Sequence, residues 1–427
     1  MTALAGAIIL FYGKIKNNML IQRENQIGVG CCDFNGNEKK YVNEVLDSGR
    51  LSYGPFSKKF EKTFAALHNC RHGVMVNSGT GALRIAVAAL KEINNWQDGD
   101  EVIAPAVTFV ATTNVIIDHG LRPVFADVDP VTYNIDPKKI EEKITGKTKA
   151  IMVVHLFGQP AEMDPILEIA KRYNLKIIED SCETMFAKYK GRPVGSFGDV
   201  SCFSTYMAHI LVTGVGGYIL TNNNECAVIC RSLANHGRDS IYIGIDDDKN
   251  LDEKGLSLVV NRRFKFERLG YSFRATEMEA AIGVAQLERW EEIIKKRQEN
   301  AKFFIDNLGR LGSYLQFPLW PNYVSHSFMM FPIVVKDKRI KKADLVMFLE
   351  KYNIETRDMM PLLNQPIYKK LYGNIEERYP VAKWINGNGF YIGCHQLIAE
   401  EEREYIIGVF KEFFDNYEAI NNNANFF

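Results

Sequence analysis

The chain has 427 residues, of which 46% are hydrophobic and 24% are charged, and its 52 basic side chains balance its 52 acidic ones. This composition excludes an intrinsically disordered chain and a coiled coil, and it fits one large or two ordinary globular domains. A net charge of zero also lacks the basic surplus that is typical of proteins binding nucleic acid or an anionic membrane. We therefore expect neither of those partners.

Residues 1–35 are interpreted as an N-terminal extension. Its apolar stretch, residues 3–12, is shorter than the ~20 residues that a membrane-spanning helix needs, and it lacks the basic start of a secretory signal. The eight cysteines include no C-x-x-C pair, so neither a zinc site nor a disulfide framework is expected. These features predict a cytoplasmic protein without a metal centre.

From residue 73 onward, short β-rich runs alternate with helical stretches, the order that builds a mostly parallel sheet covered by helices. The runs show little polar alternation and end at turn-forming residues, as expected of strands buried on both faces. They are GVMVNSG (73–79), EVIAPA (101–106), RPVFADVD (122–129), KAIMVVHLFG (149–158) and LKIIEDS (175–181). Apolar spacing predicts crossover helices over 81–91 and 163–173. The chemistry should lie at the carboxyl ends of the strands.

The second half of the chain predicts a long helix followed by a smaller domain. Residues 246–255 are polar and acidic and are interpreted as a surface excursion. A helix is expected over 276–308, where Thr276 and Glu279 have the spacing of a capping box. Strand-like and helical segments follow, so we expect a large α/β domain over 36–300 and a small C-terminal α+β domain over 301–427.

Two segments at predicted strand ends contain candidate site residues. Residues 77–82 (NSGTGA) open a helix, so their backbone N–H groups and the hydroxyls of Ser78 and Thr80 could hold a phosphate. Small residues there also serve as an ordinary turn. Asp180 ends a buried strand, where a carboxylate needs a cationic or protonated partner unless it caps a helix. From these residues alone, both interpretations remain open at each place.

Other polar residues have both a functional and a structural interpretation. His155 lies near the active edge of the sheet and is equally well explained as a packed histidine. His236 and His326 could contact a substrate. Arg274 and Arg357 could pair with a nucleotide diphosphate or with the carboxylate of an amino donor, and surface salt bridges are the alternative.

Eight segments resemble, in order and spacing, the sugar aminotransferase family named for DegT and StrS. They are NSGTGAL, PAVTFVATTN, RPVFADVDPVTYNID, KAIMVVHLFGQPAEMD, IIEDSCET, GSFGDVSCFSTY, GVGGYILTN and LGYSFRATEMEAAIGVAQLERW. The resemblance runs from about residue 40 to the end of the chain. It implies the α/β fold known as PLP fold type I, which is aspartate aminotransferase-like. It also implies pyridoxal phosphate (PLP) enzymes that act on nucleotide-linked keto sugars, usually as homodimers.

The resemblance implies roles for individual residues. Gly79, Thr80 and Ser204 would contact the cofactor phosphate. Phe109 would stack on the pyridine ring, and Asp180 would pair with the pyridinium nitrogen, which is the cation that its burial requires. The joint match favours the cofactor interpretation of these segments over the structural one.

Two positions depart from the family pattern and leave room for an unusual substrate or for a protein that has lost catalysis. Ser272 stands where the family commonly has an asparagine that reaches the cofactor phosphate of the neighbouring subunit, and its hydroxyl can still donate a hydrogen bond. Val215 replaces a usual glutamate and cannot donate one.

His209 is the departure that decides the predicted reaction. It stands where the family has its Schiff-base lysine, and no lysine occurs between Lys190 and Lys249. Imidazole cannot form that imine, yet with a pKa of about 6.5 it can accept and return a proton. This change resembles a branch of the family, the 3-dehydratases of nucleotide-linked 4-keto-6-deoxyhexoses, which hold pyridoxamine phosphate (PMP) without a covalent bond. Glu183 fits too, since that branch often has an acid where aminotransferases have glutamine.

The resemblance therefore predicts a PMP-dependent dehydratase in which His209 moves a proton at the cofactor's methylene carbon and the hydroxyl on sugar carbon 3 leaves as water. Cys226 and Cys230 have no further cysteine nearby for an iron–sulfur cluster, so an amino donor such as glutamate would regenerate PMP. Two alternatives remain. One is a nucleotide-sugar aminotransferase, and the other is a non-catalytic cofactor- or sugar-binding relic.

Overall fold

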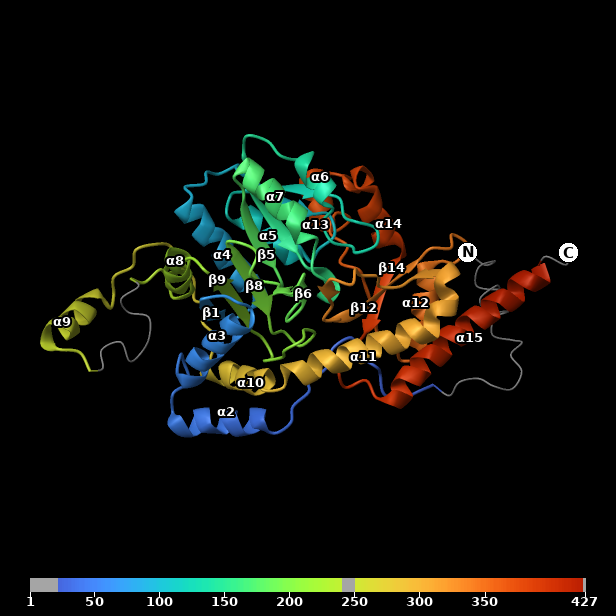
Figure 1. The fold of residues 1–427 in the computed structure, drawn as a ribbon, viewed down its shortest axis with the longest axis horizontal. Helices are drawn as coiled ribbons and strands as arrows, with labels where there is room; N and C mark the ends of the chain where they lie inside the picture. The colour runs from blue at the N-terminus through green and yellow to red at the C-terminus, as the bar shows by residue number, and fades with distance from the viewer. Residues whose placement is uncertain (1–21, 240–249, 425–427) are drawn as a thin grey trace.

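The computed structural model describes residues 22–239 and 250–424 (Figure 1). The apolar stretch 3–12 lies outside these residues, as do residues 246–249 of the predicted surface excursion. Within the described ranges, no helix combines the length and the apolar character that crossing a membrane requires.

A seven-stranded sheet forms the centre of the larger part of the molecule (Figure 1). Its order is β1-β9-β8-β5-β4-β2-β3, and neighbouring strands are parallel except at β9, which is antiparallel to both β1 and β8. The strands are β1 (His72–Val76), β2 (Glu101–Pro105), β3 (Arg122–Ala126), β4 (Thr148–Val154), β5 (Lys176–Asp180), β8 (Val200–Ser204) and β9 (Gly217–Thr221). All five predicted strands are therefore confirmed.

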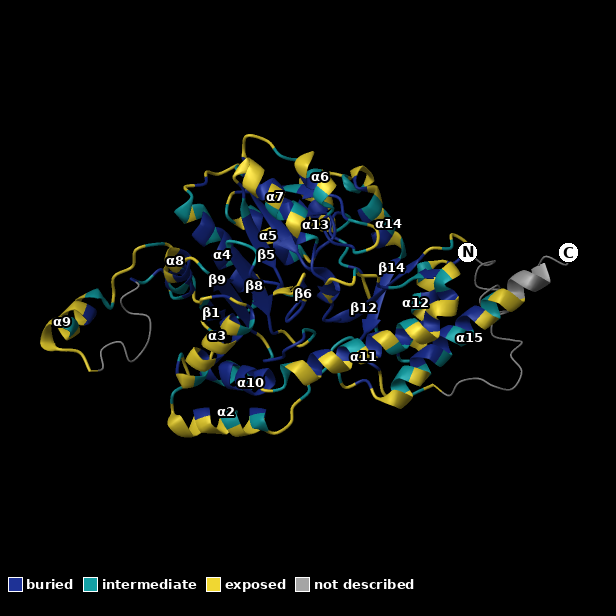
Figure 2. Cartoon of the chain, in the orientation of Figure 1, coloured by how far each residue is buried: buried dark blue, intermediate teal, exposed yellow. Residues whose placement is uncertain are grey.

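Helices cover both faces of this sheet, and Figure 2 shows the strands buried between them. Side chains alternate along a strand: Val102 and Ala104 belong to one apolar cluster, and Ile103 between them belongs to another. The helices of this part are α2 (Asn37–Ser48), α3 (Pro55–Leu67), α4 (Gly79–Ile93), α5 (Val110–Asp118), α6 (Pro137–Glu141), α7 (Met163–Tyr173) and α8 (Asn224–Ala234). The predicted crossovers correspond to α4 and α7.

A smaller antiparallel sheet forms the C-terminal part. Its order is β10 (Leu315–Gln316), β12 (Met330–Val335), β14 (Gly389–Gly393) and β13 (Thr356–Asp358). Its helices are α12 (Lys342–Lys351), α13 (Pro366–Tyr372), α14 (Pro380–Asn388) and α15 (Glu400–Ala424). This is the expected α+β content. A third, short antiparallel sheet consists of β11 (Val324–Ser325), β6 (Lys188–Tyr189) and β7 (Arg192–Pro193). In sequence, β6 and β7 come between β5 and β8, whereas β11 comes between β10 and β12.

The single helix predicted over 276–308 is wrong, because the chain forms α10 (Glu277–Leu287) and α11 (Trp290–Leu308). The backbone of Arg289 leaves the helical region, at φ −133° and ψ 22°. Its guanidinium binds the carboxylates of Asp33 at 2.9 Å and Glu38 at 3.3 Å. No proline or glycine marks this break, which coincides with a tertiary contact. The capping box of Thr276 and Glu279 is confirmed.

The segment before α2 packs against the C-terminal half of the chain. Ile27 forms a parallel β-bridge with Ile354, and Arg23 pairs with Glu402 at 2.8 Å. Residues 22–35, assigned to an extension from the sequence, therefore include a folded part of the molecule. The proposed division at residue 300 falls inside α11, whose Ile293 and Phe304 belong to different apolar clusters.

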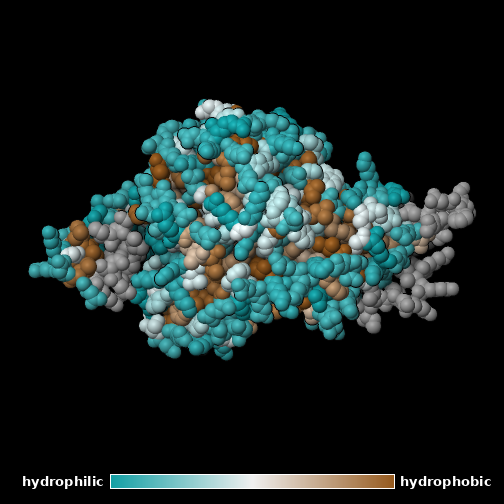
Figure 3. All heavy atoms as spheres, in the orientation of Figure 1, coloured by the Kyte–Doolittle hydropathy of each residue, from teal (hydrophilic) through white to brown (hydrophobic). Residues whose placement is uncertain are grey.

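α9 (Glu253–Arg262) projects from the body of the molecule, and the chain after it returns to the body at Arg268, which contacts Glu92 and Ser232 (Figure 1). We call residues 253–269 the arm. Its apolar side chains include Phe264, which is 81% exposed, and Leu269, which is 98% exposed. Figure 3 shows hydrophobic residues gathered on this projection. So much exposed apolar surface is typical of a contact region.

Glu277 joins the start of α10 to the start of α3. Its carboxylate accepts the N–H groups of Gly54, Phe56 and Ser57 at 2.7, 2.5 and 3.1 Å, and the hydroxyl of Ser57 at 2.6 Å. The first N–H groups of a helix have no partner within it, and they carry partial positive charge. The buried carboxylate therefore caps α3 from a distant part of the chain.

Glu277→Ala should lower the free energy of unfolding by about 3 kcal/mol, because several buried donors lose their acceptor together. The midpoint of thermal unfolding, followed by circular dichroism, checks this. Glu292→Ala removes an exposed carboxylate from the first turn of α11 and should have little effect. Equal losses in the two variants would contradict the capping role.

Candidate active site

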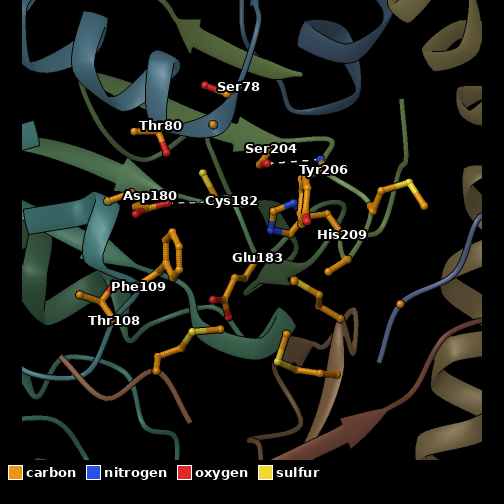
Figure 4. Close-up of a pocket in the computed structure, with 18 of the residues that line it drawn as sticks. Ser78, Thr80, Thr108, Phe109, Asp180, Cys182, Glu183, Ser204, Tyr206 and His209 are labelled. Atoms are coloured by element: carbon orange, nitrogen blue, oxygen red, sulfur yellow. Dashed lines mark hydrogen bonds between the residues drawn. The ribbon is translucent and has the colours of Figure 1, made fainter. Parts of the chain in front are cut away.

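A cavity of about 630 Å³ lies beyond the carboxyl ends of β1, β2, β5 and β8 (Figure 4). Parallel strands bring the loops that follow them to one edge of the sheet, so residues distant in sequence meet there. Of the eight residues to which the resemblance assigns a catalytic or cofactor-binding role, seven line it: Gly79, Thr80, Phe109, Asp180, Glu183, Ser204 and His209. Ser272 is exposed elsewhere on the surface and does not line it.

One wall of the cavity presents hydrogen-bond donors for an anion. Gly79 and Thr80 form the first turn of α4, and Ser204 ends β8. A side chain at position 79 would place its Cβ 2.7 Å from the Cβ of Ser204, so glycine permits this close approach. The Ser78 hydroxyl is already engaged, since it accepts the N–H of Gly81 at 2.9 Å. The free N–H groups of the helix start and two hydroxyls therefore face the same space.

Phe109 provides an aromatic surface on the cavity wall. It precedes α5, and its side chain lines the cavity while 56% of it is exposed to solvent. An aromatic ring left so open is unusual in a folded core and offers a face for a planar ligand.

Asp180 is a buried acid at the end of β5. Its carboxyl accepts the Thr112 hydroxyl at 2.7 Å and the backbone N–H of Cys182 at 3.2 Å. Burial raises the pKa of Asp180, and these two donors, together with a smaller effect of nearby His155, oppose that change. No cationic side chain of the described residues pairs with it. A positively charged ligand in the cavity would supply the missing partner.

Glu183 is a second buried acid in the cavity. Its Oε2 accepts the backbone N–H of Phe157 at 3.0 Å. Burial raises the pKa of Glu183 to about 8, with the Phe157 N–H opposing and Asp180 reinforcing the shift. At neutral pH the carboxyl is therefore largely protonated, so it can donate a hydrogen bond as well as accept one.

His209 lies in the loop between β8 and β9, and Figure 4 shows its ring directed into the cavity. The side chain is half-buried, and Nδ1 has no hydrogen-bond partner among the described residues. Burial and then the charge of Arg297 lower the pKa of His209 to about 4. The imidazole is thus an uncharged base at neutral pH with a free ring nitrogen. The described lining residues include no lysine.

Several lining residues were not expected from the sequence. Val29 and Gly30 come from the segment assigned to the extension, and Cys182 and Tyr206 lie beside predicted site residues without a chemical signal of their own. Arg357, which had two open interpretations, also lines the cavity and pairs with Glu355. Cys182 lies within IIEDSCET and Tyr206 directly follows CFST, so both could have been predicted as cavity residues from their neighbours. No local sequence feature predicts that Val29 and Gly30 reach the cavity.

The remaining candidates lie outside this cavity. His155 is buried between the Glu179 carboxylate, 3.1 Å from its Nε2, and the N–H of Ala161, 3.0 Å from its Nδ1, which fits the packed interpretation. His236 and Arg274 contact each other at 3.4 Å, beside Ser272. His326 is buried against Phe328, with ring centroids 3.7 Å apart.

Comparison with known proteins assigns the chain to a family. Residues 33–411 match the DegT/DnrJ/EryC1/StrS aminotransferase family. The chain belongs to this family. It is 35% identical to the GDP-perosamine synthase of Escherichia coli O157:H7, over 89% of this chain and 96% of the relative. It is 31% identical to the GDP-4-keto-6-deoxy-D-mannose 3-dehydratase of E. coli O55:H7 (strain CB9615 / EPEC), over 88% of this chain and 96% of that relative.

A solved structure of an E. coli GDP-4-keto-6-deoxy-D-mannose-3-dehydratase with bound hydrated PLP matches this fold with a TM-score of 0.82. The two sequences are 29% identical, and the match covers 91% of this chain and 100% of the other. The predicted family, type I fold, enzyme class and cofactor type are thereby confirmed. The relatives comprise both a dehydratase and an amino-sugar synthase, so they support a PLP enzyme that modifies sugars without choosing between the two reactions.

Glu183→Gln should make the stability of the cofactor-free protein less dependent on pH. Below about pH 4.5 the carboxyl is neutral in both the folded and the unfolded chain. Between pH 4.5 and about 8 the unfolded chain releases this proton while the folded chain retains it, so the contribution of Glu183 to stability falls as pH rises. At pH 8 the free energy of unfolding of the variant should exceed that of the wild type by a few kcal/mol, the order of magnitude expected for such a pKa shift.

Thermal unfolding midpoints between pH 5 and pH 8 test this expectation. Glu168→Gln on α7 makes the same change at an exposed position and serves as the control. Parallel pH profiles for wild type and Glu183→Gln would contradict a retained proton on Glu183.

Proposed function

We propose that this protein is a nucleotide-linked 4-keto-6-deoxyhexose 3-dehydratase that uses PMP held without a covalent bond. The observation that carries the proposal is His209, which points into the cavity at the position of the family lysine while no described lining residue is a lysine. Covalent attachment of the cofactor through this loop is chemically impossible, whereas proton transfer is not.

The cavity residues fit the cofactor. Gly79, Thr80 and Ser204 present donors for its phosphate, and Phe109 offers a ring face to the pyridine. Asp180 has no cationic partner among the described side chains, so a protonated pyridine nitrogen would supply the compensating charge. When bound, PMP supplies an amine for the sugar carbonyl and a ring that takes up the electrons of a broken C–H bond.

His209 performs the proton transfers in this proposal. Its uncharged ring accepts a proton from the cofactor's methylene carbon at a ring nitrogen. The resulting imidazolium then donates that proton to the hydroxyl leaving sugar carbon 3, because one imidazole can act first as a base and then as an acid. Glu183 holds its own proton and can orient a neighbouring oxygen by donating a hydrogen bond.

Arg357 is suited to binding the amino donor that restores PMP. Arg357 lines the cavity, and about half of its side chain is exposed. Its guanidinium donates to the Glu355 carboxylate and to the Thr356 carbonyl, and a donor carboxylate would compete with Glu355 for it. A guanidinium binds a carboxylate through two parallel hydrogen bonds, so an amino acid such as glutamate is the proposed donor.

A nucleotide-sugar aminotransferase is the second candidate. The observation in its favour is the identity to GDP-perosamine synthase, 35%, which exceeds the 31% identity to the 3-dehydratase. An aminotransferase would add nitrogen at sugar carbon 4 and keep the carbon 3 hydroxyl, so the products distinguish the two candidates.

We also propose that the protein acts as a homodimer. Ser272 lies outside the cavity of its own chain, directly after the arm with its exposed Phe264 and Leu269. Pairing of two copies through the arm would cover this apolar surface and bring Ser272 toward the cavity of the second copy.

With PMP or with PLP and glutamate, a nucleotide-linked 4-keto-6-deoxyhexose should give a product that lacks the oxygen at carbon 3 and keeps the carbonyl at carbon 4. Mass spectrometry and NMR of the sugar identify it. His209→Asn should reduce turnover by at least about 100-fold, because loss of a general acid–base group costs that much, while PMP binding followed by absorbance persists.

A 4-amino sugar with an intact carbon 3 hydroxyl would reject dehydration in favour of the aminotransferase. Borohydride treatment provides an independent check, since reduction should leave no cofactor attached to a lysine. Absence of turnover in the wild type with retained cofactor binding would point to the relic.

Leu269→Asp should shift the protein toward monomer in sedimentation velocity experiments, because it places a charge on apolar surface that the dimer would bury. Met347→Asp is a matched control, since Met347 is 68% exposed on α12 in the other part of the molecule. A wild-type monomer, or an equal response to both changes, would contradict pairing through the arm.

A further inference from the structure

A buried arginine lies directly behind the candidate base. Arg297 is on α11, and its side chain is only 1% exposed. Its guanidinium donates to the carbonyl oxygens of Met329 at 2.9 Å, Phe328 at 3.3 Å and His209 at 3.4 Å. One cation thus joins the loop that carries His209 to the chain entering β12, and Met329 and Met330 there line the cavity as well.

The charge of Arg297 is not cancelled nearby. No carboxylate among the described residues forms an ion pair with it, and its Nε has no hydrogen-bond partner there. Asp33 is the carboxylate whose charge affects the pKa of Arg297, but it forms its ion pair with Arg289. Carbonyl oxygens satisfy N–H groups but carry no net charge, so the positive field persists in the protein interior.

The thiols beside Arg297 do not neutralise it either. Burial raises the pKa of Cys31 to about 11 and that of Cys394 to about 12, even though Arg297 opposes both shifts. Both thiols are therefore uncharged at neutral pH. Burying a lone guanidinium costs several kcal/mol, and packing alone does not require a positive charge at this position.

We propose that Arg297 is a positioning residue for His209: its hydrogen bond to the His209 carbonyl holds the loop in place, and its charge adds to burial in disfavouring protonation of the imidazole. This inference rests on the proposed role of His209 in proton transfer. It assigns to α11, which contributes no lining residue of its own, a part in setting the working pH of the site.

The surroundings of His209 support an effect of Arg297 on its protonation. Burial lowers the pKa of His209, and Arg297 lowers it further because a positive charge disfavours a second positive charge nearby. Other titratable groups surround this pair. Tyr206 is on the loop of His209, and Asp180 and Glu183 are on the opposite cavity wall. Cys31 and Asp33 belong to the segment before α2, and Cys394 and His395 follow β14. Of the charged groups, Arg297 alone contributes to the pKa of His209 among the described residues.

The test is an NMR titration of cofactor-free protein with ¹³C-labelled histidine, in which His209→Asn identifies the signal of His209. Arg297→Gln removes the charge and keeps a donor, and it should raise the pKa of His209 by about 1, equivalent to about tenfold tighter proton binding. Arg297→Lys keeps the charge and should leave that pKa low. Lys295→Gln makes the same charge change on the exposed face of α11 and should have no effect.

An unchanged His209 pKa in Arg297→Gln, or an equal rise in Arg297→Lys, would overturn the proposal. If Arg297→Gln does not fold, the titrations of the wild type and of Arg297→Lys test the proposal instead. A wild-type His209 with an ordinary pKa of about 6.5 would also overturn it. The acid limb of kcat/KM should move with the titration. A shifted titration in a protein that turns over no sugar would instead reject the proposed function and leave the effect of Arg297 standing.

Discussion

The site depends on a buried carboxyl group that lacks a counter-charge. Asp180 lies at the end of β5 and receives only neutral donors from Thr112 and Cys182. A lone carboxylate in a protein interior is unstable, so it either keeps its proton or obtains a cation from a ligand. Phe109, the start of α4 and His209 are arranged around the same space, and together they specify a planar, anionic and partly protonated ligand.

The reaction, in contrast, depends on a single side chain. A family whose members include a perosamine synthase and a 3-dehydratase shares one fold and one cofactor pocket, so neither feature separates the two activities. In the proposed reaction, the imidazole of His209 replaces the amine that would bind the cofactor covalently, and it acts only in proton transfer. Arg297 contacts this position from the other side, because its guanidinium donates to the backbone carbonyl of His209.

The sequence predicted the part of the site that follows local patterns. Gly79, Asp180 and Ser204 lie at strand ends that periodicity and turn residues reveal, and parallel topology then brings them together. The break at Arg289 was missed because it coincides with contacts to Asp33 and Glu38, which lie 256 and 251 positions earlier in the chain and which no local pattern records. Arg357 was found as a candidate, but its presence in the cavity depends on how the second sheet docks. The role of Ser272 stays a prediction, since it concerns a second chain.

The participation of Val29 and Gly30 in the cavity wall has a consequence for biosynthesis. Gly30 approaches the loop of His209 so closely that an added Cβ would lie 2.8 Å from the Cα of Ala208, and Tyr391 closes the same enclosure from near the other end of the chain. The enclosure is therefore assembled from residues separated by almost the entire polypeptide. A ribosome-bound chain that lacks its last strand has only part of this wall, so complete enclosure of the coenzyme follows translation instead of accompanying it.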